Sequence, residues 1–340
     1  MSIKIPSVVA LSFAAGIFSL RAQPASVQQL QNSQQAIQQL APLYGLQNTH
    51  TNAPELYEGE NMDVGPQRIL RLNPRPNYFE VLLDSQAFYT DNANFDTSAN
   101  AIRSMVFVNT AQMAFTPPGY KWGPGTLSPV VGFYSQWYNY ENTRMSPFDF
   151  EAQTVFVNGR YATEDWQFTL GANYTRLLNQ SDYEQTYQEF LPNIGAQRTF
   201  HIGETMLFAI GNEVQYHFSE VPATTVNIGG GGTIAGTGPA DINNRLDDIV
   251  SLTYAWQITR QMVLQPYYRF QYSYYRYDTL ATSSRNDYLH TVGVTLYYFF
   301  NRNASLRTFF NYSLKQSDDP YTPAYHEYDG GLGAALDVTF

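Results

Sequence analysis

Cysteine is absent from the 340 residues of this chain, which excludes disulfide bonds and thiolate metal sites. Charged residues make up only 14% of the chain, and histidine occurs 5 times. Beyond the N-terminus, no stretch approaches the ~18 consecutive apolar residues of a transmembrane helix. The 29 acidic residues outnumber the 19 basic ones, so there is no electrostatic case for binding nucleic acid. Such a chain depends on backbone pairing and side-chain packing for its fold.

Aromatic residues, in contrast, are abundant. The chain contains 27 Tyr and 22 Phe, yet its mean hydropathy is only −0.34. Membrane β-barrels combine these two properties, because their lipid-facing residues are averaged with polar residues that face the lumen.

The N-terminus has the features of an export signal. Lys4 is the only early charge, the stretch from Ile5 to Leu20 is apolar and rich in small residues, and Arg21-Ala22 precedes the polar Gln23. We predict a signal peptide over residues 1–22; the alternative is a retained anchor helix. Its removal would leave 17 basic and 29 acidic residues, a net charge of −12.

Residues 23–76 form a second segment that is rich in glutamine at its start. Its apolar residues have roughly helical spacing only up to Leu40, and turn formers and charges follow from Asn48. We interpret this segment as a periplasmic extension that either binds a partner as an arm or folds back into the lumen as a plug.

The C-terminal residues alternate strictly between two faces. Leu332, Leu336, Val338 and Phe340 share one apolar face, and the residues between them are small or polar. This pattern is typical of a strand between lipid and an aqueous lumen. The ending resembles the C-terminal assembly signal of bacterial outer-membrane β-barrels, which implies the barrel-assembly machinery as a partner. The alternative is an edge strand of a soluble sheet.

Alternation with a period of two recurs from Asn77 to the end of the chain. It predicts an all-β fold, a closed antiparallel transmembrane β-barrel of about 12 strands over residues 77–340. The runner-up is a soluble β-sandwich or solenoid. The predicted strands lie near residues 77–90, 104–116, 129–140, 150–162, 165–178, 193–202, 205–219, 246–259, 262–277, 286–300, 304–316 and 327–340.

The connections between these strands alternate in length, as short periplasmic turns and long outer loops do in such barrels. This parity places both ends of the barrel in the periplasm. The stretch 117–128 breaks the rule, and is either a structured turn or a sign that the strand count is wrong. Short turns fall at 162–165, 203–204, 259–261 and 301–303, and long loops at 91–103, 141–149, 179–192, 221–245, 278–285 and 316–326.

Aromatic residues near the predicted strand ends suit the two interfacial girdles of a membrane barrel. They are Trp137, Tyr161, Trp166, Trp256, Tyr288, Tyr298 and Phe340.

Local motifs for catalysis or metal binding are weak. His217 shares a predicted inner face with Glu213 and Gln215, but no second His or Cys has ligand spacing, so we expect no metal. His290 faces outward near the outer rim, which invites comparison with outer-membrane phospholipases. The position two residues on is Val292 rather than serine, so a lipid hydrolase is only a remote alternative.

The glycine run at 229–232 lacks the ending of a phosphate-binding loop, and we interpret it as part of a flexible outer loop. The oxygen-rich segment 91–96 lacks EF-hand spacing and is interpreted as a loop tip.

A diffuse set of inward-facing polar residues is the more informative constellation. An acidic sector on the first and last strands is expected beside a basic sector on the ninth and eleventh, so that the lumen is either an open polar pore or filled by side chains. The candidate lumen-facing residues are Glu80, Asp84, Gln153, Gln167, Asn173, Glu213, Gln215, Arg269, Gln271, Arg307, Asn311, Lys315 and Asp337.

The segment from Phe79 to Phe95 resembles the opening hairpin of generic bacterial outer-membrane β-barrel proteins, which implies location in the outer membrane and contact with its lipid and lipopolysaccharide. We expect a passive channel for small hydrophilic solutes or ions, with no cofactor and no enzymatic activity. The alternative is a structural or assembly protein with a filled or plugged lumen and a periplasmic arm that binds a partner.

Overall fold

The computed structural model describes residues 78–203, 205–220, 225–228, 232–235, 241–277, 283–301, 303–320 and 322–340. The predicted signal peptide and periplasmic extension, residues 1–76, lie outside these ranges. The strands are β1 Phe79–Thr90, β2 Ser104–Phe115, β3 Tyr120–Trp122, β4 Gly125–Tyr140, β5 Phe150–Ala162, β6 Trp166–Asn179, β7 Gln185–Ile202, β8 Met206–Glu220, β9 Thr225–Ile228, β10 Gly232–Ala235, β11 Arg245–Thr259, β12 Met262–Tyr275, β13 Arg285–Phe299, β14 Ala304–Ser317 and β15 Tyr325–Thr339.

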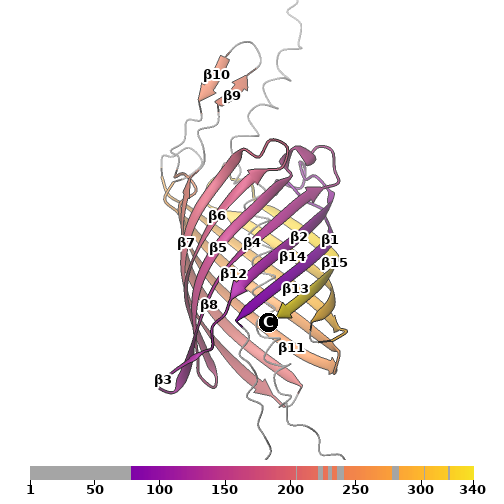
Figure 1. Cartoon of the computed structure of the whole chain (residues 1–340). Coiled ribbons are helices and arrows are strands. Elements are labelled where there is room, and N and C mark those ends of the chain that lie inside the picture. The colour runs from indigo at the N-terminus through magenta and orange to yellow at the C-terminus, as the bar shows by residue number, and fades with distance from the viewer. Residues whose placement is uncertain are drawn as a thin grey trace, which may run out of the picture.

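Within the described residues, 13 strands form one sheet, and every pairing in it is antiparallel (Figure 1). The short β3 pairs only with β4, so the other twelve strands form the barrel. Pairing of β1 with β15, from Glu80↔Thr339 to Thr90↔Asp329, joins the first strand to the last. The predicted twelve-stranded closed barrel is therefore confirmed, and the alternative of a β-sandwich is wrong.

The two ends of the barrel sequence meet at this seam. The Phe340 N–H donates to the carbonyl of Phe79 at 2.9 Å, and the Phe340 carbonyl accepts from the N–H of Tyr78 at 3.1 Å. Closure satisfies backbone groups that would otherwise be exposed along two sheet edges.

The connection at 117–128, which breaks the alternation of loop lengths, is a small hairpin. β3 pairs with the start of β4 from Tyr120↔Leu127 to Trp122↔Gly125, and Gly123 supplies the positive φ of 58° that the turn requires. The N–H of Thr116 donates to the Tyr78 carbonyl at 2.7 Å, so the hairpin begins beside the two ends of the barrel sequence. The predicted strand count is right, and β4 begins at Gly125 rather than at residue 129.

Strand β7 begins at Gln185, eight residues before the start predicted from the sequence. The predicted loop over 179–192 is therefore wrong, and only residues 180–184 connect β6 to β7. The misleading residue is Pro192, which suggests a strand break because it has no N–H to donate. It lies within β7, where the pairing with β8 skips from Phe190↔Phe218 to Asn193↔Gln215.

The other long connections lie at the end of the barrel opposite the termini. One carries the 3-10 helix η2 Ser146–Phe148, and another carries a separate hairpin of β9 and β10. Among the described residues, no helix is long and apolar enough to cross a membrane.

The outer face of the barrel is apolar and edged by aromatic side chains. At the end that carries the C-terminus, ring centroids lie 6.1 Å apart for Phe79–Phe340 and 5.4 Å apart for Phe79–Phe115. At the opposite end the corresponding distances are 5.5 Å for Tyr272–Tyr288 and 4.7 Å for Tyr312–Tyr328. Exposed aliphatic residues between these two aromatic girdles include Leu83, Val131, Val155, Val157, Leu170, Ile194, Ile210, Val292, Val294, Leu306 and Leu332.

Candidate functional site: the polar lumen

The inner face of the barrel is lined by polar side chains that are almost fully buried. Gln136, Thr154 and Gln265, for example, are between 0% and 1% exposed. Many of these groups bond across strands. Gln136 donates to the Thr110 hydroxyl at 3.1 Å, and the hydroxyls of Thr154 and Thr175 lie 2.9 Å apart. The alternation of the sequence thus produces an apolar exterior and an interior with many polar groups. The interior also holds a buried apolar cluster that includes Phe88, Val106 and Leu177.

A salt bridge links β14 to β1 across the strand between them. The Arg307 guanidinium donates to both carboxylate oxygens of Asp84 and, at 3.0 Å, to the amide oxygen of Gln86. Gly333 on β15 lies between the partners, since it pairs with Arg307 on one side and with Gln86 on the other. A Cβ atom at Gly333 would lie 2.8 Å from Arg307 Cζ. The glycine therefore provides the space through which the arginine crosses β15.

The outer end of the lumen, opposite the termini, holds a buried ionic network. His217 on β8 lies between two carboxylates, with Nδ1 2.8 Å from Glu189 Oε2 and Nε2 3.0 Å from Asp247 Oδ2. Arg245 contacts the same Asp247 at 3.1 Å, and Gln271 donates to it at 2.9 Å. All these side chains are buried. We call Glu189, His217, Arg245, Asp247 and Gln271 the outer network.

A second ionic group lies on the neighbouring strands at the same end. Asp287 on β13 is 3.2 Å from Arg285 Nε and 3.0 Å from Lys315 Nζ. The Arg285 guanidinium also lies over the Tyr275 ring, 3.7 Å from its centroid. Glu327 accepts from the Thr90 hydroxyl at 2.9 Å. Acidic and basic side chains therefore surround the outer end of the lumen.

Three asparagines on adjacent strands present free amide oxygens on the inner face. Among the described residues, the Oδ1 atoms of Asn158, Asn173 and Asn193 are buried and accept no hydrogen bond. Asn158 and Asn193 flank Gly171 in the β5–β6–β7 register, so no side chain separates them there. These oxygens can accept bonds from a solute or coordinate a cation in the lumen.

The structure places the predicted lumen residues on the inner face, with one exception. Gln153 is directed outward, on the same face as the exposed Val155, and the prediction of an inward Gln153 is wrong. There its amide oxygen accepts from Arg176 at 2.6 Å and its amide donates to Glu151 at 2.7 Å, so a polar network on the outer face satisfies its side chain. The inward residues are Glu80, Asp84, Gln167, Asn173, Glu213, Gln215, Arg269, Gln271, Arg307, Asn311, Lys315 and Asp337.

Two further candidate sites take on ordinary roles. His290 faces outward, and its Nδ1 lies 2.9 Å from the hydroxyl of Tyr268, a phenol rather than a serine nucleophile. Asp91 accepts from the Tyr328 N–H at 2.8 Å, and Asn92 bonds to Asp96 within the loop. Among the described residues, no group of three His, Cys, Asp or Glu side chains is placed to hold a metal ion.

The sequence alone did not identify Glu189, Arg245 and Asp247. Glu189 lies in the part of β7 assigned to a loop, and the other two lie at the start of β11 beside a glycine-rich connection. The alternation of Tyr187, Glu189 and Leu191 was a signal for the missed strand. Which residues would then face His217 depends on register, which alternation alone does not fix.

No family model matches this chain, and no curated protein matches it. Several solved structures are similar to this chain at low identity. An outer membrane channel from Pseudomonas putida F1 is 12% identical, with a TM-score of 0.48 over 77% of this chain and 96% of that one. The β-domain of the Bordetella autotransporter BrkA is 10% identical, with a TM-score of 0.43 over 76% and 99%. The NanC porin is 10% identical, with a TM-score of 0.39 over 75% and 98%. The likeness concerns the fold and not the substrate.

Proposed function

We propose that this chain is a passive channel of the bacterial outer membrane, carrying small hydrophilic solutes or ions through the barrel lumen. The observation that carries this proposal is the contrast between the two faces of the barrel. An apolar outer belt with aromatic girdles suits lipid, and the polar and charged groups of the inner face suit hydrated solutes. No bond-making step and no cofactor is part of the proposal.

The outer-membrane location rests on the barrel itself and on the predicted N-terminal signal peptide. A closed barrel leaves no unpaired sheet edge in a hydrocarbon layer, where each free backbone group costs several kcal/mol. The C-terminal strand presents Leu332, Leu336, Val338 and Phe340 on its outer face. We propose that the barrel-assembly machinery recognises this strand, as the resemblance of the ending implies.

The inner face favours cations over anions. Its carboxylates outnumber its arginines and lysines, and the free Asn oxygens add acceptors rather than donors. The carboxylates are Glu80, Asp84, Glu189, Glu213, Asp247, Asp287, Glu327, Asp329 and Asp337, and the bases are Arg160, Arg245, Arg269, Arg285, Arg307 and Lys315.

A second candidate function has its own supporting observation. The side chains of the outer network are buried, as are Gln136, Thr154 and Gln265 nearer the middle of the lumen. Such burial suits a filled or plugged lumen, in which the barrel serves assembly or structure and the N-terminal arm binds a periplasmic partner. A lipid hydrolase is not proposed, because the hydroxyl beside His290 belongs to Tyr268.

Single-channel recording distinguishes the two functions. The mature chain, refolded in detergent and shown to be heat-modifiable, is inserted into a planar bilayer under a KCl gradient. If the chain is a channel, we expect steady conductance with a reversal potential that shows cation selectivity. A folded barrel without conductance would overturn it.

A chain lacking residues 23–76 is recorded beside the mature chain. Conductance that appears only after this deletion would identify a plugged lumen. Equal conductance in both chains, with loss of a co-purifying periplasmic protein from the shortened one, would identify a partner-binding arm.

A further inference from the structure

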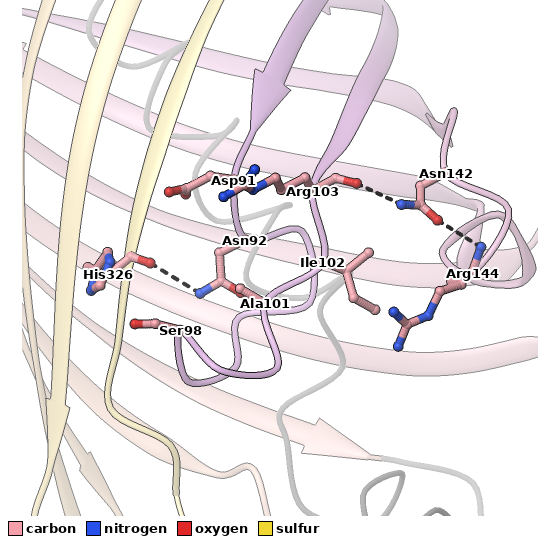
Figure 2. A pocket seen from close by; sticks show the side chains of 9 residues that line it. All are labelled: Asp91, Asn92, Ser98, Ala101, Ile102, Arg103, Asn142, Arg144 and His326. Carbon is pink, nitrogen blue, oxygen red and sulfur yellow. Dashed lines mark hydrogen bonds between the residues drawn. The ribbon is translucent and has the colours of Figure 1, made fainter.

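A cavity of about 420 Å³ lies at the outer rim of the barrel, between two long loops and the start of β15 (Figure 2). The first loop connects β1 to β2, and the second connects β4 to β5. The residues that line the cavity are Asp91, Asn92, Ser98, Ala101, Ile102, Arg103, Asn142, Arg144 and His326.

The cavity is lined on one side by an outward residue of β15, next to the outer aromatic girdle. His326 is exposed and lies two residues before Tyr328 on the same outward face of β15. Tyr328 belongs to that girdle, with its ring centroid 4.7 Å from Tyr312 and 6.2 Å from His326. Because girdle aromatics lie at the level of the lipid headgroups, the cavity lies at the depth of headgroup phosphates.

The cavity is basic. Arg103 and Arg144 are exposed, and among the described residues neither forms an ion pair, while His326 adds a further exposed nitrogen donor. Asp91 is the single carboxylate of the lining, and one of its oxygens already accepts from the Tyr328 N–H at 2.8 Å. Two unpaired guanidinium groups therefore dominate the charge of this surface.

Hydrogen bonds fix the walls that carry these groups. The Asn142 amide donates to the Arg103 carbonyl at 2.8 Å, and its oxygen accepts from the Arg144 N–H at 3.0 Å (Figure 2). Asn92 donates to the His326 carbonyl at 3.1 Å. Two asparagines thus hold the three basic residues, which come from three chain segments, around one cavity.

We propose that this cavity binds the phosphate of a phosphorylated lipid headgroup in the outer leaflet. Guanidinium groups match phosphate oxygens in geometry and charge. Because Arg103 and Arg144 lie next to the outer aromatic girdle, the phosphate of a lipid headgroup is favoured over a soluble anion. The inference rests on the outer-membrane location proposed above, but not on an open lumen. Lipid binding and conductance are therefore tested separately.

The test is native mass spectrometry of the detergent-solubilised mature chain with lipid A that carries its two phosphates. The wild type is compared with the double variant Arg103→Gln/Arg144→Gln. The matched control is Arg198→Gln, since Arg198 is an outward arginine at the opposite end, 4.8 Å from the Phe200 ring. Loss of two charge-assisted contacts predicts a drop of tenfold or more in apparent affinity for the double variant, and none for the control.

Two further probes separate the sources of phosphate. Dephosphorylated lipid A is expected to bind at least about tenfold more weakly than the phosphorylated form. Inorganic phosphate is expected not to displace the lipid at matched concentration. Equal binding of dephosphorylated lipid, efficient displacement by inorganic phosphate, or unchanged binding in a heat-modifiable double variant would each overturn the proposal.

Discussion

Arg307 on β14 reaches Asp84 on β1 by passing over Gly333 on β15, and it binds both oxygens of that carboxylate. The contact joins the basic and acidic sectors of the lumen. It also ties together the three strands at which the barrel closes, because β15 pairs with both β14 and β1. The ion pair between Arg307 and Asp84 therefore requires a residue without a side chain at position 333.

Substitution of Gly333 by alanine is expected to loosen this bridge. The new Cβ would lie 2.8 Å from Arg307 Cζ and 3.0 Å from its Nε, so the guanidinium must move away. We expect a loss of about 1–3 kcal/mol in the free energy of unfolding, as for other overpacked sites. Urea unfolding in detergent micelles, followed by tryptophan fluorescence, measures this difference.

The matched control is Gly330→Ala on the same strand. A Cβ there would lie 3.6 Å from Phe310 Cδ2, an ordinary contact on the outer face. We expect a change within about 0.5 kcal/mol. Equal destabilisation by the two substitutions would show that Gly333 does not serve the arginine in particular.

A double-mutant cycle over Asp84 and Arg307 tests the bridge directly. Each single variant, Asp84→Asn or Arg307→Gln, leaves a largely buried charge without its partner and is expected to cost about 3–5 kcal/mol. The double variant should cost clearly less than the sum, because it removes both charges. Additive losses in equilibrium unfolding would argue against coupling of the two side chains.

Removal of the imidazole at His217 is expected to weaken the outer network. His217→Ala leaves Glu189 and Asp247 without the donor that they share, although Asp247 keeps Arg245. The expected cost is about 3–5 kcal/mol in the free energy of unfolding. The control is His201→Ala, because His201 is exposed at the opposite end of the barrel. Similar unfolding midpoints for the two variants would contradict a structural role of the network.

The apolar belt predicts a position-dependent penalty for charge. Leu170 is 68% exposed and lies on the outer face of β6 between Phe168 and Tyr174. Leu170→Arg is expected to destabilise the barrel in lipid vesicles by about 2–4 kcal/mol, measured as a loss in the free energy of unfolding. Tyr120→Arg, in the β3–β4 hairpin outside the barrel wall, should have little effect. A small penalty at Leu170 would show that this surface does not meet lipid.

Alternation in the sequence is sufficient to predict the closed barrel and its twelve strands. It works because a period of two assigns each residue to a face without reference to any other strand. It fails where a proline interrupts the pattern. Pro192 suggested a loop, although a barrel strand tolerates it where the ladder is interrupted.

The contacts within the lumen could not be predicted in the same way. The sequence places His217 on the same face as Glu213, four residues away on the same strand, whereas its partners are Glu189 and Asp247 from the two neighbouring strands. The choice depends on register across three strands, and a shift of one residue reverses every face. Gln153 is a different case, because it has the same parity as Val155 and Val157, so that alternation within β5 already places it on the outer face.

The seam between β1 and β15 also bears on the order of folding. Glu80 pairs with Thr339, so the contact that closes the sheet joins residues from nearly opposite ends of the described chain. Such a contact has a high loop-closure entropy and raises the contact order, whereas each hairpin along the chain is local. Hairpins can therefore form one after another along the chain as an open curved sheet. The barrel closes only after the final strand has added to that sheet. A chain that loses its final strand, β15, would leave β1 and β14 as exposed edges, with aggregation as the expected fate.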